Sequence, residues 1–118
     1  MKRLKLFKEA FTQDEYYQEI TQDEYYEEFD LLHQEFFTEK EIQSIITMAN
    51  KYGYQCWNSN KSECISLRCK GKPFLNIYKI EDGWYYVKKD TYNEHWEITK
   101  YYKCDQFDGL EKFISDIK

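Results

Sequence analysis

The feature that most constrains the fold is a series of strand-like runs between residues 63 and 104. In residues 63–69 apolar and polar side chains alternate, which is typical of a half-buried strand. After a second run, the pair Asp82-Gly83 leads into a third that begins at Trp84, and Asp-Gly favours the positive φ angles of a tight hairpin. A last run at residues 96–104 is expected to pair with the third, at residues 84–89, and to turn Trp96, Ile98, Tyr102 and Cys104 toward the buried face. These runs predict an antiparallel sheet.

Helix signals flank these runs. Thr38 and Glu41 have the spacing of a capping box, and Gly53 stands where a left-handed residue is expected to end the helix. Residues 54–57 are expected to form a first strand. A second apolar stripe follows the last run and consists of Leu110, Phe113, Ile114 and Ile117. Residues 38–118 therefore predict an α+β domain: an antiparallel sheet of four to five strands with helices packed on one face, in two layers.

The preceding residues, 1–37, are predicted to be an acidic, Tyr-rich helical arm. Residues 9–41 contain 12 acidic side chains and one basic side chain, whereas the whole chain has a net charge of -5. Residues 11–19 and 20–28 repeat the motif Thr-Gln-Asp-Glu-Tyr-Tyr. Each threonine is placed to cap a helix, and the glutamate three residues later completes a capping box. Nine residues are fewer than three turns, so we expect short helical segments.

Length and composition limit the class of protein. A chain of 118 residues is one domain with room for a real core. It has no run of 18 apolar residues and no apolar segment near its start, so we expect neither a membrane span nor a signal peptide. The expected location is the cytoplasm, or the host cytoplasm if a virus encodes the protein. The four cysteines are then expected to be free and mostly buried thiols.

Sites for catalysis, metals or cofactors are not predicted. The spacing of Cys64 and Cys69 is not that of a zinc module, and the four glycines form no phosphate-binding loop. A zinc site assembled across the sheet stays as a less favoured alternative. Cys104 could meet His95, but the strand pattern places this thiol on the buried face, where cysteines are usually inert. We therefore expect a protein that is not an enzyme, with no cofactor and no metal ion.

Binding of another protein is the first functional expectation, because a dense array of carboxylates can dock on a basic surface and tyrosines are frequent interface anchors. The identity of the partner does not follow from the sequence. The candidate partner-binding residues are Asp14, Glu15, Tyr16, Asp23, Glu24 and Tyr25. The arm could equally pack on the basic sheet of its own chain.

Binding of single-stranded nucleic acid is the alternative. The strand faces opposite the expected core would display aromatic rings between cations, on which bases stack and phosphates bind. The candidate residues are Arg68, Lys70, Tyr86, Lys88, Tyr101 and Lys103, with Tyr78 and Trp84 on the same face. An overall pI near 5.1 speaks against this alternative.

The two ends of the chain resemble small uncharacterised proteins of large tailed phages and related viruses. The resemblance lies in the opening Met1-Lys-Arg-Leu-Lys-Leu-Phe7, the Thr-x-x-Glu-Tyr-Tyr boxes, Trp84-Tyr-Tyr-Val87 and the segment at residues 102–110. Such proteins have no assigned chemistry, so no functional residue is carried over. The resemblance implies a virus-encoded accessory protein that binds a host or viral macromolecule.

Overall fold

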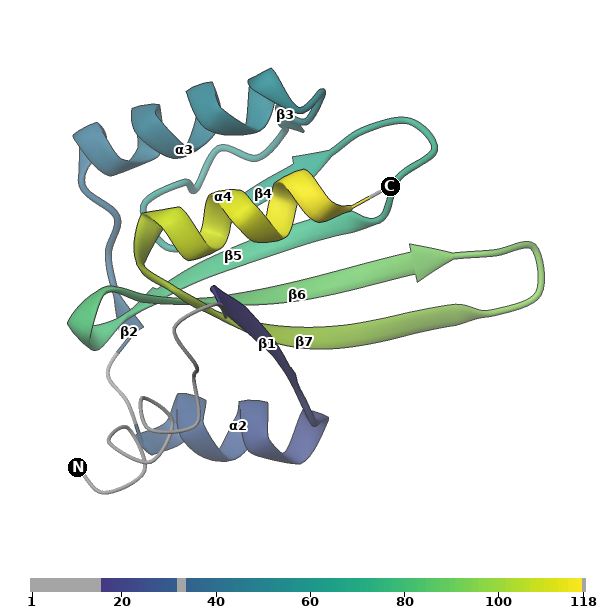
Figure 1. The fold of residues 1–118 in the computed structure, drawn as a ribbon, viewed down its shortest axis with the longest axis horizontal. Helices are drawn as coiled ribbons and strands as arrows, with labels where there is room; N and C mark the ends of the chain where they lie inside the picture. The colour runs from purple at the N-terminus through teal and green to yellow at the C-terminus, as the bar shows by residue number, and fades with distance from the viewer. Residues whose placement is uncertain (1–15, 32–33, 118) are drawn as a thin grey trace.

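The computed structural model describes residues 16–31 and 34–117, which form an open antiparallel sheet and three α-helices (Figure 1). The strand order is β1-β7-β6-β5-β4-β3, with the short β2 also paired to β5. The strands are β1 (Tyr17–Ile20), β2 (Gln34–Glu35), β3 (Gln55–Cys56), β4 (Ile65–Arg68), β5 (Phe74–Ile80), β6 (Trp84–Tyr92) and β7 (Glu97–Asp105). The helices are α2 (Gln22–Leu31), α3 (Glu39–Lys51) and α4 (Gln106–Asp116). The predicted α+β class is confirmed, but the sheet has seven strands instead of four or five.

Two hairpins form the centre of the sheet, as the sequence predicts. Between β5 and β6, Asp82 has φ 66° and Gly83 has φ 78°, the left-handed values that the Asp-Gly pair favours. Strands β6 and β7 pair from Trp84 opposite Asp105 to Tyr92 opposite Glu97. The outer end of this second hairpin projects beyond β1 (Figure 1). For this reason Ile98, expected on the buried face, is 44% exposed.

One face of the sheet is covered by α3 and α4 and is called the α3/α4 face. The predicted capping box starts α3: the Glu41 N–H donates to Thr38 Oγ1 at 3.2 Å, and the Thr38 N–H donates to Glu41 Oε1 at 2.9 Å. The apolar stripes of both helices pack on alternate residues of β4 to β7. This core includes Ile42, Ile45, Met48, Leu110, Phe113 and Ile114 from the helices and Ile65, Leu67, Leu75, Ile77, Val87, Tyr102 and Cys104 from the sheet.

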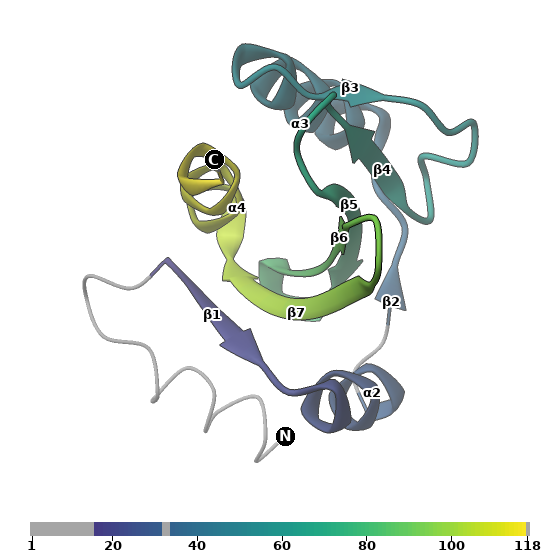
Figure 2. The ribbon, with the colours of Figure 1, turned by 90° about the vertical axis from the view of Figure 1, so that its right-hand side faces the viewer.

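Helix α2, from residues 1–37, covers part of the opposite face, which is called the α2 face (Figure 2). The helices of residues 38–118 share one face, but the predicted two-layer packing of the whole chain is not confirmed. Tyr25 of α2 packs with its ring centroid 4.4 Å from that of Tyr101 and 5.5 Å from that of Tyr86. Phe29 lies edge-on to Tyr78 at 5.5 Å. This second core exists because Tyr25 and Phe29, four positions apart and therefore on the same side of the helix, both face the sheet.

The two copies of the nine-residue repeat adopt different structures. The second copy forms α2, with the predicted capping box between Thr21 and Glu24. The end of the first copy and Ile20 form β1, which pairs with β7, so the predicted helical arm is not confirmed as helical throughout. Thr12 and Glu15, the predicted box of the first copy, lie outside the described residues. Because β1 and β2 belong to the same sheet as β5 and β7, the described part of residues 1–37 is built into the fold.

The four cysteines are free thiols, and only Cys104 among them is fully buried. Burial raises the pKa of the Cys104 thiol well above its usual value, which lowers its thiolate fraction. We therefore expect iodoacetamide to alkylate Cys56, Cys64 and Cys69 in the native protein and to leave Cys104 unmodified until denaturant is added. Peptide mass spectrometry after timed alkylation measures this order, and early labelling of Cys104 would contradict it.

Candidate functional site

The half of the α2 face that lies beneath helix α2, which we call the inner half, contains a buried ion pair. Lys103 Nζ lies 3.3 Å from Glu28 Oε1, and both side chains are 0% exposed. The hydroxyl of Tyr86 donates to the same carboxylate oxygen at 2.9 Å. The ammonium group of Lys103 also lies 4.3 Å from the centroid of the Trp84 ring. Helix α2 thus meets the basic sheet of its own chain, one of the two arrangements that the sequence left open.

Because α2 covers the inner half, three of the six predicted nucleic-acid-binding residues are not accessible. Tyr86, Tyr101 and Lys103 point to the expected side of the sheet, but they are buried beneath α2 and reach no ligand in this conformation. Burial raises the pKa of Tyr86, and the Glu28 carboxylate raises it further. The sequence pattern identified the face correctly. It did not identify the helix that covers it.

Helix α2 does not cover the outer half of this face, which we call the open half. It carries three aromatic side chains, Trp57, Phe74 and Tyr92, which we call the aromatic row. The ring centroids of Trp57 and Phe74 are 6.3 Å apart, and those of Phe74 and Tyr92 are 5.4 Å apart in an edge-to-face arrangement. Trp57 is 57% exposed and Tyr92 is 55% exposed. The rings come from the segment after β3, from β5 and from β6, so they cross the sheet.

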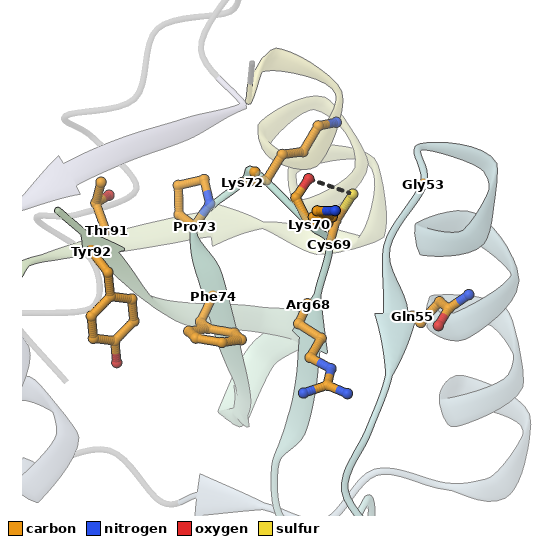
Figure 3. A pocket seen from close by; sticks show the side chains of 11 residues that line it. Gly53, Gln55, Arg68, Cys69, Lys70, Lys72, Pro73, Phe74, Thr91 and Tyr92 are labelled. Atoms are coloured by element: carbon orange, nitrogen blue, oxygen red, sulfur yellow. Dashed lines mark hydrogen bonds between the residues drawn. The ribbon is translucent and has the colours of Figure 1, made fainter. Parts of the chain in front are cut away.

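Arg68 belongs to this open half. Its guanidinium carbon lies 5.5 Å from the centroid of the Trp57 ring, within the range of a cation–π contact. Figure 3 shows the side chains of Arg68, Phe74 and Tyr92 projecting to the same side of the strands. This agrees with the register, because Leu67 pairs with Leu75 and places Arg68 beside Phe74. A planar ligand on the row would meet a cation at its edge.

A strip of hydrogen-bonding side chains separates the aromatic row from α2. Ser66, Asn76 and Lys88 stand side by side on β4, β5 and β6, and we call them the polar strip. The Ser66 hydroxyl donates to Asn76 Oδ1 at 2.6 Å. Two acidic residues also lie near the row: Asp90, which is buried and accepts from Thr99 Oγ1 at 2.6 Å, and the exposed Glu97 opposite Tyr92.

A cavity of about 860 Å³ opens where the row meets the turn between β4 and β5 (Figure 3). Its lining includes three cations and no carboxylate; the cations are Arg68, Lys70 and Lys72. They do not converge on one point, because Lys72 projects to the other side of the strands from Arg68 in Figure 3. Its ammonium group instead donates to the backbone oxygen of Tyr52 at 3.3 Å. The cavity therefore adds positive charge at the edge of the aromatic row, but its cations do not form a single anion-binding site.

The predicted protein-binding residues are divided by the structure. Asp14 and Glu15 lie outside the described residues. Tyr25 is buried against the sheet, and Glu24 accepts the hydrogen bond that caps α2. Tyr16 and Asp23 are exposed. The six residues therefore do not form one described surface.

Three of the six predicted nucleic-acid residues lie on the open half or its rim: Arg68, Lys70 and the half-buried Lys88. The sequence analysis missed all three rings of the aromatic row. Tyr92 was missed because the third run was ended too early, at Lys89. Continued alternation from Trp84 through Tyr86 and Lys88 would have placed Tyr92 on the same face.

Other kinds of site find no support within residues 16–31 and 34–117. No three His, Cys, Asp or Glu side chains in this part of the chain lie close enough together to hold a metal ion. Among the described helices, none is both long and apolar enough to cross a membrane.

Comparison with known proteins gives no match: no protein-family model, no curated protein and no solved structure is similar to the chain.

Proposed function

We propose that this protein binds single-stranded nucleic acid on the open half of the α2 face. The observation that carries the proposal is the aromatic row: Trp57 and Tyr92 are exposed, the half-buried Phe74 lies between them, and Arg68 stands against Trp57. Bases stack on such rings irrespective of sequence, because every base has a π-face. Lys70 and Lys88 stand near the row and supply cations for the phosphates.

The position of α2 limits the ligand. The helix covers Tyr86 and Tyr101, so three rings remain for stacking, and two or three stacked bases are typical of sheet surfaces that bind RNA. Asp23, an exposed acidic residue of α2, would repel a phosphate backbone that continued across the helix. A short single-stranded segment fits this surface better than a long duplex.

The test is a titration of end-labelled oligonucleotides of about 12 nucleotides at several salt concentrations, followed by fluorescence anisotropy. If Arg68, Lys70 and Lys88 each contact one phosphate, the slope of log K against log salt should be about −2. Affinity should then fall about 20-fold between about 50 mM and about 200 mM salt. A duplex of the same length should bind more weakly. Absence of binding at the lowest salt would overturn the proposal.

Binding of a protein partner is the second candidate, and one observation favours it. Trp, Tyr and Arg are the residue types most enriched at interface hot spots, and all three are exposed on the open half. A protein ligand would bury the rings without phosphate contacts. Its affinity would therefore depend less steeply on salt than the slope given above.

A further inference from the structure

We infer that Asn76, with Lys88 beside it, selects bases that carry a keto oxygen, namely thymine, uracil and guanine, over bases that present an amino group at the same position. This inference rests on the proposed nucleic-acid binding and adds a base preference to it. Asn76 is half-buried on β5, in the polar strip next to the aromatic row. A base stacked on the row would have its edge toward this strip.

The amide oxygen of Asn76 lies on the β4 side of the strand, where two side chains contact it. Ser66 Oγ donates to Asn76 Oδ1 at 2.6 Å, and Cys64 Sγ approaches the same oxygen at 3.9 Å. The amide oxygen is therefore engaged on the β4 side. The amide nitrogen carries two further N–H donors, and no described protein group accepts a hydrogen bond from them.

This arrangement excludes the usual pairing of asparagine with adenine. That pairing uses the amide oxygen to accept from the adenine amino group and the amide nitrogen to donate to N7. Here the oxygen accepts from Ser66 Oγ and, more weakly, from Cys64 Sγ, so both of its lone pairs are engaged and the amide offers its two N–H donors. The ammonium group of Lys88, opposite Asn76 on β6, has three N–H donors and no acceptor, so one N–H can face the base edge while another contacts a phosphate. A row of donors matches thymine O4 or guanine O6 and N7, and it repels the amino groups of cytosine and adenine.

The test compares end-labelled oligo-dT with oligo-dC of equal length, because these pyrimidines differ at the C4 substituent while their rings have similar size. We expect oligo-dT to bind at least about fivefold more tightly. Asn76→Asp keeps the acceptor for Ser66 but replaces the two donors by a second acceptor. In this variant the ratio of the two affinities should fall to about one or invert, because a carboxylate accepts from the cytosine amino group.

Asn93→Asp is the matched control. It adds the same negative charge in the turn after β6 and keeps the acceptor that binds the His95 N–H. Both aspartate variants should bind all oligonucleotides more weakly, but only Asn76→Asp should change the ratio. Equal affinities of the native protein for oligo-dT and oligo-dC, or an unchanged ratio in Asn76→Asp, would overturn the base preference and leave the proposed function standing. If neither oligonucleotide binds, both proposals fall.

Discussion

Lys103→Met is expected to destabilise the protein by about 3–5 kcal/mol, because it leaves the buried Glu28 carboxylate without the cation it faces. A domain of this size is stable by about 5–15 kcal/mol, so the loss is a large share of the total. Urea unfolding followed by tryptophan fluorescence measures it. Trp84, whose ring lies 4.3 Å from Lys103 Nζ, is a local reporter of the native state.

The double variant Glu28→Gln with Lys103→Met shows how much of the lost stability comes from the unpaired charge and how much from altered packing. Glutamine keeps an acceptor for the Tyr86 hydroxyl, and methionine fills most of the lysine volume without a charge. We expect the double variant to recover most of the lost stability. Lys112→Met is the control, because Lys112 forms an exposed pair with Asp116 and its loss should cost less than about 1 kcal/mol. If Lys103→Met lowers the free energy of unfolding as little as Lys112→Met does, the buried pair does not stabilise the protein as its burial implies.

The central hairpins are the part of the fold that the sequence predicts well. Asp82-Gly83 adopts left-handed φ values that few other residue pairs adopt without strain, and alternation fixes which residues of β5 and β6 face the core. Thr38 and Glu41 likewise determine the start of α3 through hydrogen bonds within four residues. All of these signals are local.

The repeat illustrates what local signals do not decide. Identical Asp-Glu-Tyr-Tyr segments end in β1 in one copy and lie within α2 in the other. In the first copy, the Tyr17 hydroxyl donates to Asp116 Oδ2 at 2.7 Å, and the Tyr17 ring lies 5.2 Å from that of Phe113. The pairing edge of β7 and the side of α4 therefore favour the extended form there. Such contacts join residues about 100 positions apart, beyond the reach of propensity or capping rules.

The candidate site could be predicted only in part, because local signals assign a residue to a face of the sheet but do not show which helix covers that face. Alternation assigned Tyr86, Tyr101 and Lys103 to the correct face of the sheet, but their exposure depended on where α2 would pack. Sequence charge gave a hint, because an acidic segment and a basic sheet can meet within one chain. It could not distinguish this contact from contact with a partner. Alternation along each segment can assign Phe74 and Tyr92 to a face, but that Trp57, Phe74 and Tyr92 are neighbours follows only from how the separate segments pair.

Removal of the aromatic row is expected to have the largest effect on binding. Each stacked base contributes about 1–3 kcal/mol by alanine substitution, so Trp57→Ala or Tyr92→Ala should each weaken oligonucleotide binding by about 5-fold to 150-fold. The double variant should bring binding near the limit of detection. Both side chains are more than half exposed, so their removal should change the urea midpoint little.

Trp57→Phe and Phe36→Ala are the matched variants for the aromatic row. Trp57→Phe keeps a ring for stacking and should retain most of the affinity. Phe36 is 67% exposed and follows β2, which pairs with the Ile80 end of β5, away from Phe74. Phe36→Ala therefore removes an exposed ring of similar size without touching the row, and it should bind like the native protein. If Phe36→Ala weakens binding as much as Trp57→Ala, the rings act only through general hydrophobicity, and the stacking role of the row is wrong.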